Sequence, residues 1–144
     1  MEELRTKPYS LAESKKVQLR EKIKSFLESR RDILFAYLHG TFIHGENFRD
    51  VDIALYLDKK DISGLDYELD LEVLLQDRFG YPFDVRLLNG CPVSFAFHVI
   101  KEGERVYVRD DDQRTRFEEG VLGRYLDFLF YHKRYLKEGF GVTI

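Results

Sequence analysis

Asp50 and Asp52 are two carboxylates separated by one residue, directly before an apolar run at residues 53–57. Alternate side chains of a β-strand point to the same face, so both carboxylates would face the same way while Val51 points into the core. Carboxylates held side by side repel each other unless positive charge lies between them. A hard divalent cation such as Mg²⁺, bound by carboxylate and substrate phosphate oxygens, is the usual counter-charge. The pair therefore predicts metal-dependent phosphate chemistry.

A glycine turn precedes the two aspartates. The apolar run at residues 33–38 predicts a buried strand, and Gly40 and Thr41 follow it, with Gly45 further along. Glycine allows the backbone to approach a phosphate group closely, and a threonine hydroxyl can bond to the same anion. An Asp-x-Asp pair alone is weak evidence, because many surface strands contain one by chance. Combined with the strand and the glycine turn, it predicts a site for a metal-bound nucleotide.

The stretch at residues 35–57 resembles the signature of the DNA polymerase beta-like nucleotidyltransferase superfamily. That signature is a strand, Gly-Ser, a short loop with another glycine, and Asp-x-Asp on the next strand. Gly40, Asp50 and Asp52 match it, and Thr41 stands in place of the usual Ser and keeps the hydroxyl. In its small size the chain is similar to the minimal nucleotidyltransferase (MNT) branch, whose members include antitoxins paired with HEPN-domain toxins.

The loop of this signature departs from the family pattern at two positions. Ile43 and His44 stand where many members carry a small residue and Arg, so one phosphate contact is altered. A packed or solvated histidine is the simpler interpretation of His44, and also of His39 before the turn. Arg49 can be a surface salt-bridge partner, and Thr41 a helix cap. The resemblance nevertheless implies a set of nucleotide-binding residues around the turn: Gly40, Thr41, His44, Gly45 and Arg49.

A third carboxylate in the superfamily comes from a strand that follows the intervening helix. Asp84 occupies that place in the resemblance, although the residues alone also allow a turn aspartate or a pair with Arg86. The resemblance implies that Asp50, Asp52 and Asp84 are the catalytic residues and bind two Mg²⁺ ions. Asp50 and Asp52 would hold the metal on ATP, while Asp84 would help to position a second ion and deprotonate the attacking hydroxyl. Attack on the α-phosphate would transfer AMP and release pyrophosphate.

The elements that position these residues follow from the hydrophobic periodicity. Helical spacing predicts a helix at residues 11–30, with Ser10 as its N-cap and Glu13 completing a capping box. Further elements follow in chain order: strands at 33–38 and 53–57, a charged turn at 58–61, a helix at 65–79 ended by Gly80, a strand at 81–88, a helix at 93–100, a strand at 105–109 and a helix at 111–136, with a break near Gly120 or Gly123. We therefore expect one compact domain over residues 1–144, of class α/β (α+β), with a small mixed sheet, helices packed on it and a loose lead-in at 1–8.

The segment at residues 114–135 combines aliphatic and aromatic residues with interleaved Arg and Lys. A basic, aromatic segment can bind RNA, but the net charge of −3 argues against a nucleic-acid partner. We expect a helix that packs on the sheet and leaves part of its face for a protein partner. Its Arg-Phe-Glu-Glu and Tyr-Leu-Asp-Phe pieces resemble the closing helix of MNT proteins.

Composition excludes several classes of protein. Hydrophobic residues make up 44% of the 144 residues, and twelve Phe and nine Tyr without Trp predict a core packed with aromatic rings. The single cysteine, Cys91, rules out an internal disulfide and a cysteine-based zinc site, and we expect a structural thiol. No apolar stretch approaches the roughly 20 residues that span a bilayer, and the start lacks a signal-peptide pattern. We expect a cytoplasmic protein without a membrane partner.

The expected function is the transfer of AMP from ATP, with Mg²⁺, to a protein acceptor. The resemblance implies that the acceptor is a tyrosine of a cognate HEPN toxin, which would make the chain its antitoxin. Two alternatives stay open: a non-catalytic binding module that neutralises a partner by covering it, and a nucleotidyltransferase for a small molecule such as an aminoglycoside. The three retained carboxylates argue against the first, and the small size of the chain against the second. The residues do not decide between a monomer and a homodimer.

Overall fold

The computed structural model describes residues 8–58 and 63–140. Its elements in chain order are β1 (Tyr9–Ser10), α1 (Glu13–Glu28), β2 (Ile33–His39), α2 (Thr41–His44), β3 (Asn47–Phe48), β4 (Val51–Leu57), α3 (Gly64–Phe79), β5 (Phe83–Leu87), α4 (Val93–Glu102), β6 (Glu104–Val108) and α5 (Asp111–Phe140). All eight predicted helices and strands are present, and the α/β class is confirmed. The elements β1, α2 and β3 were not predicted, because two to four residues are too few to show a period. Most of the predicted charged turn at 58–61 lies outside the described residues.

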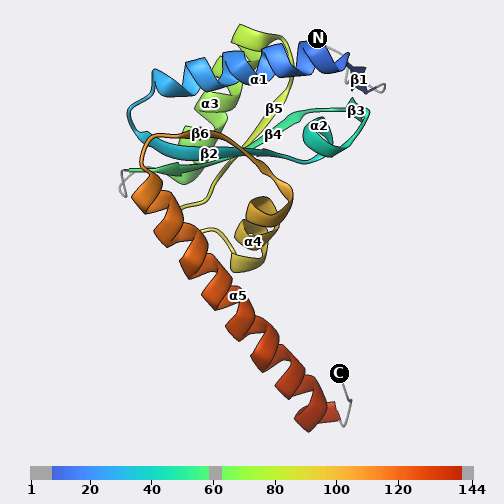
Figure 1. Cartoon of the computed structure of the whole chain (residues 1–144), viewed down its shortest axis with the longest axis vertical. Helices are drawn as coiled ribbons and strands as arrows, with labels where there is room; N and C mark the ends of the chain where they lie inside the picture. The colour runs from blue at the N-terminus through green and yellow to red at the C-terminus, as the bar shows by residue number, and fades with distance from the viewer. Residues whose placement is uncertain (1–7, 59–62, 141–144) are drawn as a thin grey trace.

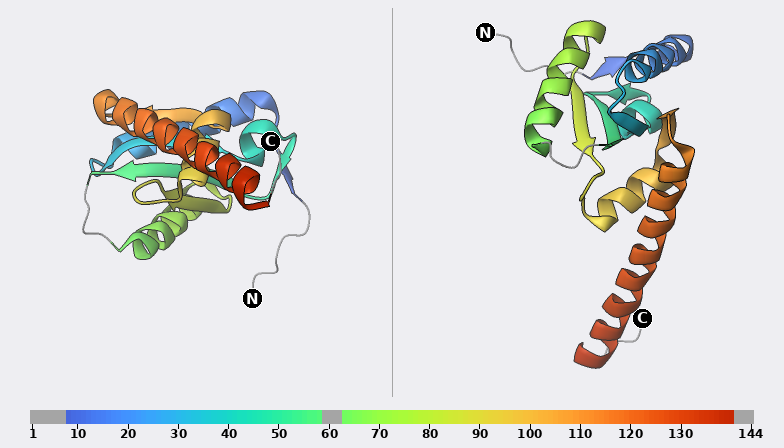
Figure 2. Two further views of the ribbon diagram at one scale, coloured as in Figure 1. Left: turned by 90° about the horizontal axis from the view of Figure 1, so that it is seen from below. Right: turned by 90° about the vertical axis from the view of Figure 1, so that its left-hand side faces the viewer.

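A mixed sheet of four strands, in the order β5-β4-β2-β6, forms the centre of the fold. β2 pairs antiparallel with β4 and β6, whereas β4 and β5 are parallel and α3 connects them. α1 and α3 pack on one face of the sheet, while α4 and the first part of α5 pack on the other (Figure 1 and Figure 2). β2 is buried along its whole length, in agreement with the apolar run at residues 33–38.

α1 begins later than predicted, and the predicted capping box is wrong. Ser10 lies in β1 opposite Asn47, and the residue before the helix is Ala12, which makes no side-chain cap hydrogen bond. Val17, an apolar residue of this helix, is exposed. The buried side of α1 consists of four residues at helical spacing: Lys16, Leu19, Ile23 and Leu27.

α3 covers the open edge of β5. The carboxylate of Glu72 accepts a hydrogen bond from the backbone N–H of Val85, and that of Glu68 accepts one from Leu87, each at 2.8 Å. Because β5 is an edge strand, these bonds occupy backbone groups that could otherwise pair with a strand of another molecule. α3 ends at Gly80 as predicted, and its φ of 80° suits the left-handed position after a helix.

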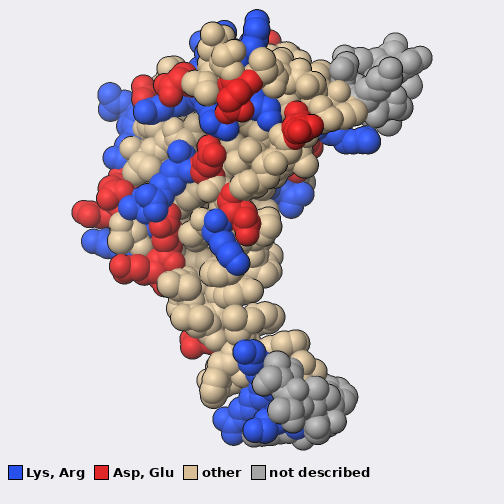
Figure 3. Space-filling view, turned by 45° about the vertical axis from the view of Figure 1, so that its right-hand side comes forward, with Lys and Arg blue, Asp and Glu red and all other residues tan. Residues whose placement is uncertain are grey.

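α5 continues without a break, so the break predicted near Gly120 or Gly123 is wrong. Its first part packs against the sheet and α4 through Phe117 and Val121. The remainder extends away from the body of the molecule, as the ribbon and the space-filling view both show (Figure 1 and Figure 3). Packing on the sheet is therefore confirmed only for the N-terminal part of this helix. Within the described residues, no helix has both the length and the apolar character needed to cross a membrane.

Candidate active site

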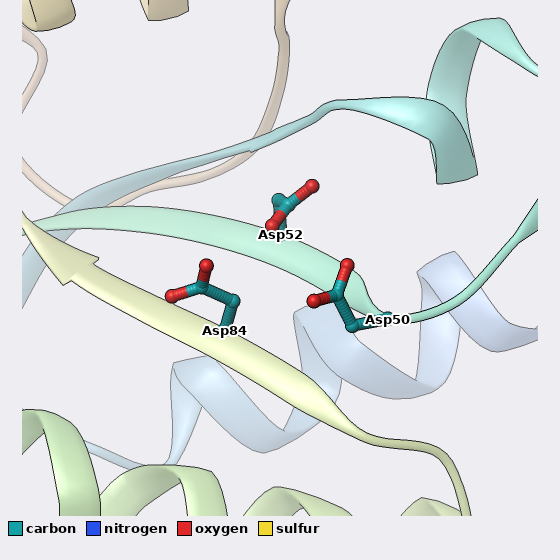
Figure 4. Close-up of side chains that lie close together, drawn as sticks. All are labelled: Asp50, Asp52 and Asp84. Atoms are coloured by element: carbon teal, nitrogen blue, oxygen red, sulfur yellow. The ribbon is translucent and has the colours of Figure 1, made fainter. Parts of the chain in front are cut away.

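Asp50, Asp52 and Asp84 meet on the face of the sheet that carries α4. The neighbours of Asp84 in β5, Phe83 and Val85, pack in the core under α1 and α3, so alternation points Asp84 to the opposite face. The parallel register of β4 and β5 places Asp52 beside Asp84, and Asp50 lies just before β4. One carboxylate oxygen of each aspartate lies within 4.8 Å of the others (Figure 4). The fold thus brings together the three residues that the sequence proposed as metal ligands, which we call the carboxylate trio.

Burial and mutual repulsion raise the pKa values of two of these carboxyl groups. The pKa of Asp52 is raised to about 7, first because burial removes solvation and then because Asp50 and Asp84 are negative, while Arg86 opposes the rise. Burial and the charge of Asp84 likewise raise the pKa of Asp50. A carboxyl group with a pKa near 7 is half protonated at neutral pH. Binding of a cation would therefore favour the charged form of Asp52.

The donor set of the trio fits a hard divalent cation. Carboxylate oxygens are the protein ligands that such ions prefer, and a cation among them would remove the repulsion that raises the pKa values. The three side chains are only half-buried, so phosphate oxygens can reach the same position. Arg86 donates to Asp84 at 3.2 Å, but its side chain is 58% exposed, and an exposed pair neutralises little of the charge.

Gly40 connects β2 to α2 in a conformation that favours glycine. Its φ is 76°, and a Cβ atom at this position would lie 2.0 Å from Oδ2 of Asp52. The carbonyl of Gly40 accepts hydrogen bonds from the backbone N–H groups of Ile43 and His44, which closes the single turn of α2. The backbone after β2 therefore lies directly against the carboxylate trio.

The other residues predicted to bind nucleotide lie around the same turn. Thr41 begins α2 with an exposed side chain, and Gly45 follows the helix where a Cβ atom would lie 2.9 Å from the carbonyl of Thr41. The Nε2 atom of His44 is hydrogen-bonded to the backbone carbonyl of Glu102, so this side chain links α2 to the end of α4. Arg49 is exposed just before Asp50. Contact of these residues with nucleotide stays a prediction.

Lys16 of α1, which was not among the predicted site residues, is hydrogen-bonded to the turn. Its side chain is buried, and its Nζ donates to the carbonyls of Phe42 at 3.2 Å and Gly45 at 2.9 Å. The ammonium group also lies near the rings of Phe42 and Phe48, 5.6 and 6.0 Å from their centroids. One signal could have revealed it, because Lys16 lies three residues before Leu19 on the apolar side of α1. A lysine at such a position needs buried acceptors.

The surroundings of His39 and Cys91 favour a packing role for each residue rather than a catalytic one. His39 lies at the end of β2 opposite Asp52, is 8% exposed and meets the ring of Phe95 edge-on with centroids 5.8 Å apart. Burial lowers the pKa of His39, which favours its neutral form. Burial raises the pKa of the Cys91 thiol, which disfavours the reactive thiolate. Both observations agree with the packing roles that the sequence favoured.

The sequence and the fold place the chain in a known family. A model of the family described as polymerase beta, nucleotidyltransferase matches residues 21–112, which contain all the candidate site residues. The chain therefore belongs to this nucleotidyltransferase family, and the superfamily expected from the glycine turn and the aspartates is confirmed. No curated protein matches the sequence.

Solved structures share the fold. One match lies in a structure of a tri-AMPylated HEPN toxin from Shewanella oneidensis in complex with an MNT antitoxin, with 15% identity, a TM-score of 0.66 and coverage of 88% of this chain and 99% of that chain. Another lies in the toxin–antitoxin structure MntA–HepT, with 16% identity, a TM-score of 0.65 and coverage of 87% and 99%. A third lies in a toxin–antitoxin structure with AMP-PNP, with 15% identity, a TM-score of 0.61 and coverage of 91% and 100%. Such low identities establish the fold alone.

Proposed function

We propose that this nucleotidyltransferase uses Mg²⁺ to transfer AMP from ATP to a tyrosine of a cognate HEPN toxin, and that it is the antitoxin of that protein. The observation that carries the proposal is the convergence of Asp50, Asp52 and Asp84 beside the glycine turn at Gly40. Three neighbouring carboxylates, of which Asp50 and Asp52 have raised pKa values, have no structural benefit without a cation, whereas a metal-bound triphosphate requires such ligands.

Each residue of the site has a defined role in this proposal. Asp50 and Asp52 would hold the cation that accompanies the triphosphate, and Asp84 would help to hold a second cation and accept the proton of the attacking hydroxyl. Two bound Mg²⁺ ions would neutralise the charge that develops on the transferred phosphoryl group. The absence of a side chain at Gly40 leaves the backbone free to approach a phosphate. Four further residues near the same turn are proposed to contact the triphosphate: Thr41, His44, Gly45 and Arg49.

The open surroundings of the trio favour a protein as the acceptor. The three carboxylates are half-exposed on the sheet face, so a side chain on the surface of a partner can reach them. Among the structural neighbours, one complex contains an AMPylated HEPN toxin with an MNT antitoxin, and another contains AMP-PNP. Both features support the proposal that ATP is the donor and a HEPN toxin the acceptor of this chain.

One observation favours a second candidate, a non-catalytic module that neutralises its partner by binding. His44 stands where many family members carry Arg, and its Nε2 is already bonded to the carbonyl of Glu102. Because this side chain is already hydrogen-bonded and is not an arginine, the affinity for the triphosphate would be lower. The intact trio is the stronger observation, because a retired site has no physical reason to keep three repelling carboxylates.

Mass spectrometry of the acceptor tests the proposal. The chain is incubated with Mg²⁺, ATP and the product of the adjacent reading frame, and the acceptor is then digested and sequenced. The expected result is one or more AMP groups on tyrosine, absent when Asp84→Asn replaces the wild type and present with the exposed control Asp70→Asn. A tight complex that shows no modification with any nucleotide would contradict the proposal and leave the binding module.

A further inference from the structure

The projecting part of α5 carries large apolar side chains that the fold does not cover. Six of them are each between 48% and 65% exposed. Three of them recur at spacings of four residues and therefore lie along one side of the helix, which we call the α5 apolar surface: Leu122, Leu126 and Phe130. The other three, Phe128, Tyr131 and Tyr135, lie on the opposite side of the helix. Monomeric proteins rarely expose so many large apolar residues on one element unless another molecule binds there.

The stability of the projecting helix also points to a partner. α5 contacts the body through Val121 and through Tyr125, whose ring stacks on that of Phe97 in α4 with centroids 3.8 Å apart. Beyond this stack the helix extends away from the sheet and its helices (Figure 1). A helix in a protein gains most of its stability from the packing of its apolar residues. We therefore expect this segment to be more stable when another molecule packs against it.

The charge of the segment selects the kind of partner. Residues 121–137 contain four basic residues and one acidic residue, whereas the whole chain has a net charge of −3. Lys and Arg side chains gather near the free end of α5 (Figure 3). Pairing of two α5 helices would bring two positive segments together, which costs free energy. A different protein, with an apolar surface bordered by Asp and Glu, is complementary both in hydrophobicity and in charge.

The position of α5 relates this surface to the carboxylate trio. α4 and α5 pack on the same face of the sheet that carries Asp52 and Asp84. In Figure 1, α5 descends from the end of β6 toward the side of the molecule on which α2 lies. A protein held on α5 is therefore on the face from which an acceptor hydroxyl must approach the trio.

We propose that the α5 apolar surface is the docking surface for the acceptor protein, which presents to it an apolar surface bordered by carboxylates. The identification of the bound protein as the acceptor rests on the function proposed above, whereas the docking itself does not. The proposal divides the work between two parts of the chain. The trio and the glycine turn perform the transfer, and α5 holds the acceptor so that its local concentration at the site is high.

The test measures binding and transfer separately. The probe is the product of the adjacent reading frame, with its Kd measured by calorimetry without nucleotide and its AMP transfer measured at varied acceptor concentrations with Mg²⁺ and ATP. Leu126→Glu places a negative charge in the surface, and Val17→Glu on α1 is the control, because Val17 is an exposed apolar residue outside any such group. We expect Leu126→Glu to raise the Kd and the KM for the acceptor about tenfold or more, with unchanged kcat and KM for ATP. The double variant Lys133→Glu/Lys137→Glu, which reverses two positive charges, should also raise the Kd. The control Lys133→Arg/Lys137→Arg keeps both charges and should bind like the wild type.

The outcomes distinguish a failure of docking from a failure of the proposed function. If the wild type transfers AMP and Leu126→Glu transfers it equally well, the proposed docking surface is wrong but the proposed function stands. If the wild type binds the probe but transfers no AMP, and Leu126→Glu abolishes the binding, the proposed function is wrong but the docking surface stands. Light scattering that shows a dimer of this chain, dispersed by Leu126→Glu, would overturn the proposal in favour of self-association.

Discussion

Asp52 lies close both to the other carboxylates of the site and to the backbone of the glycine turn. Its carboxyl group lies beside Asp84 in the strand register, and its Oδ2 atom fills the space that a side chain at position 40 would need. Burial and two negative neighbours raise its pKa to about 7. Since a cation and a proton compete for the same oxygens, the charge of the trio depends on both pH and metal.

The first prediction concerns the pH dependence of stability without metal. The pKa of Asp52 is about 7 in the folded protein and ~4 in the unfolded chain, so the folded state binds the proton more tightly between these values. The free energy of unfolding should therefore fall as the pH rises from about 4 to about 7. Asp52→Asn removes this contribution, and at pH 8 it should be more stable than the wild type by ~1–2 kcal/mol, a figure reduced for partial exposure.

Urea unfolding of the metal-free protein at several pH values measures this effect. The exposed variant Asp70→Asn on α3 serves as the control and should keep the wild-type pH profile. Saturating Mg²⁺ should restore the stability of the wild type at pH 8 but add little to Asp52→Asn. Identical pH profiles for the wild type and Asp52→Asn would refute the electrostatic description of the trio.

The second prediction concerns the space beside Asp52. Gly40→Ala places a Cβ atom 2.0 Å from Oδ2 of Asp52, so the carboxylate or the turn must move. Gly90→Ala is a matched control, because Gly90 has a φ of +71° and nothing within 4 Å of the added Cβ. Both variants pay the strain of a left-handed alanine, about 1 kcal/mol. We expect AMP transfer to fall about a hundredfold in Gly40→Ala and to stay near the wild-type rate in Gly90→Ala. Equal rates would show that the turn does not constrain the site.

Site residues could be predicted from the sequence alone where neighbouring residues in the chain define them. Asp50 and Asp52 follow from their spacing and the strand behind them. Asp84 could be added only through the family resemblance, because its place beside Asp52 depends on parallel pairing across the whole of α3. Lys16 was missed for a similar reason, since its acceptors Phe42 and Gly45 are 26 and 29 residues away.

At the scale of elements, the contact between α1 and α2 determines how firmly the glycine turn is held. Because α2 is a single turn, it has little stability of its own. The hydrogen bonds from Lys16 to two carbonyls fix it to a long helix that is anchored in the core. The support of the turn thus comes from an element that carries none of the proposed catalytic residues.

The third prediction tests this support. Lys16→Met keeps the length of the side chain and removes its donors, leaving two carbonyls without their partner at a cost of ~1–3 kcal/mol. We expect a lower melting temperature and a KM for ATP raised on the order of fivefold, because the turn is held less firmly. The neighbouring exposed Lys15→Met should change neither value. Unaltered ATP binding in Lys16→Met would mean that the lysine stabilises the fold without positioning the turn.

The long elements were predictable and the short ones were not. Periodicity indicates a helix or strand only over several residues, so β1 and β3 were invisible, and Ser10 was assigned to a cap although it pairs as a strand. Composition also misled at single positions. Gly120 and Gly123 suggested a break in α5, yet a glycine costs only ~1 kcal/mol in a helix that is otherwise favourable. In α3, the buried residues are Leu71 and Leu75, while four other apolar residues are exposed: Leu65, Leu69, Val73 and Leu74.

At the scale of the whole molecule, the chain consists of a shared catalytic core and a projecting helix. The family model matches residues 21–112, which include the sheet strands, the glycine turn and the trio, and this match ends as α5 begins. Chemistry common to the family therefore resides in the matched part. The surface that we propose to select the acceptor resides almost wholly in α5, so changes in partner need not disturb the site.

The role of the carboxylate trio can be tested by the rate at which label passes from α-labelled ATP to the acceptor protein, with and without Mg²⁺, for the wild type and Asp52→Asn. The variant keeps the shape of the side chain and removes the charge that would bind the cation. We expect labelled acceptor only with the wild type and Mg²⁺, and a loss of about a thousandfold or more in Asp52→Asn. Undiminished labelling by Asp52→Asn, or labelling that persists after all divalent cations are chelated, would contradict the assignment of the carboxylate trio as the metal-dependent transfer site.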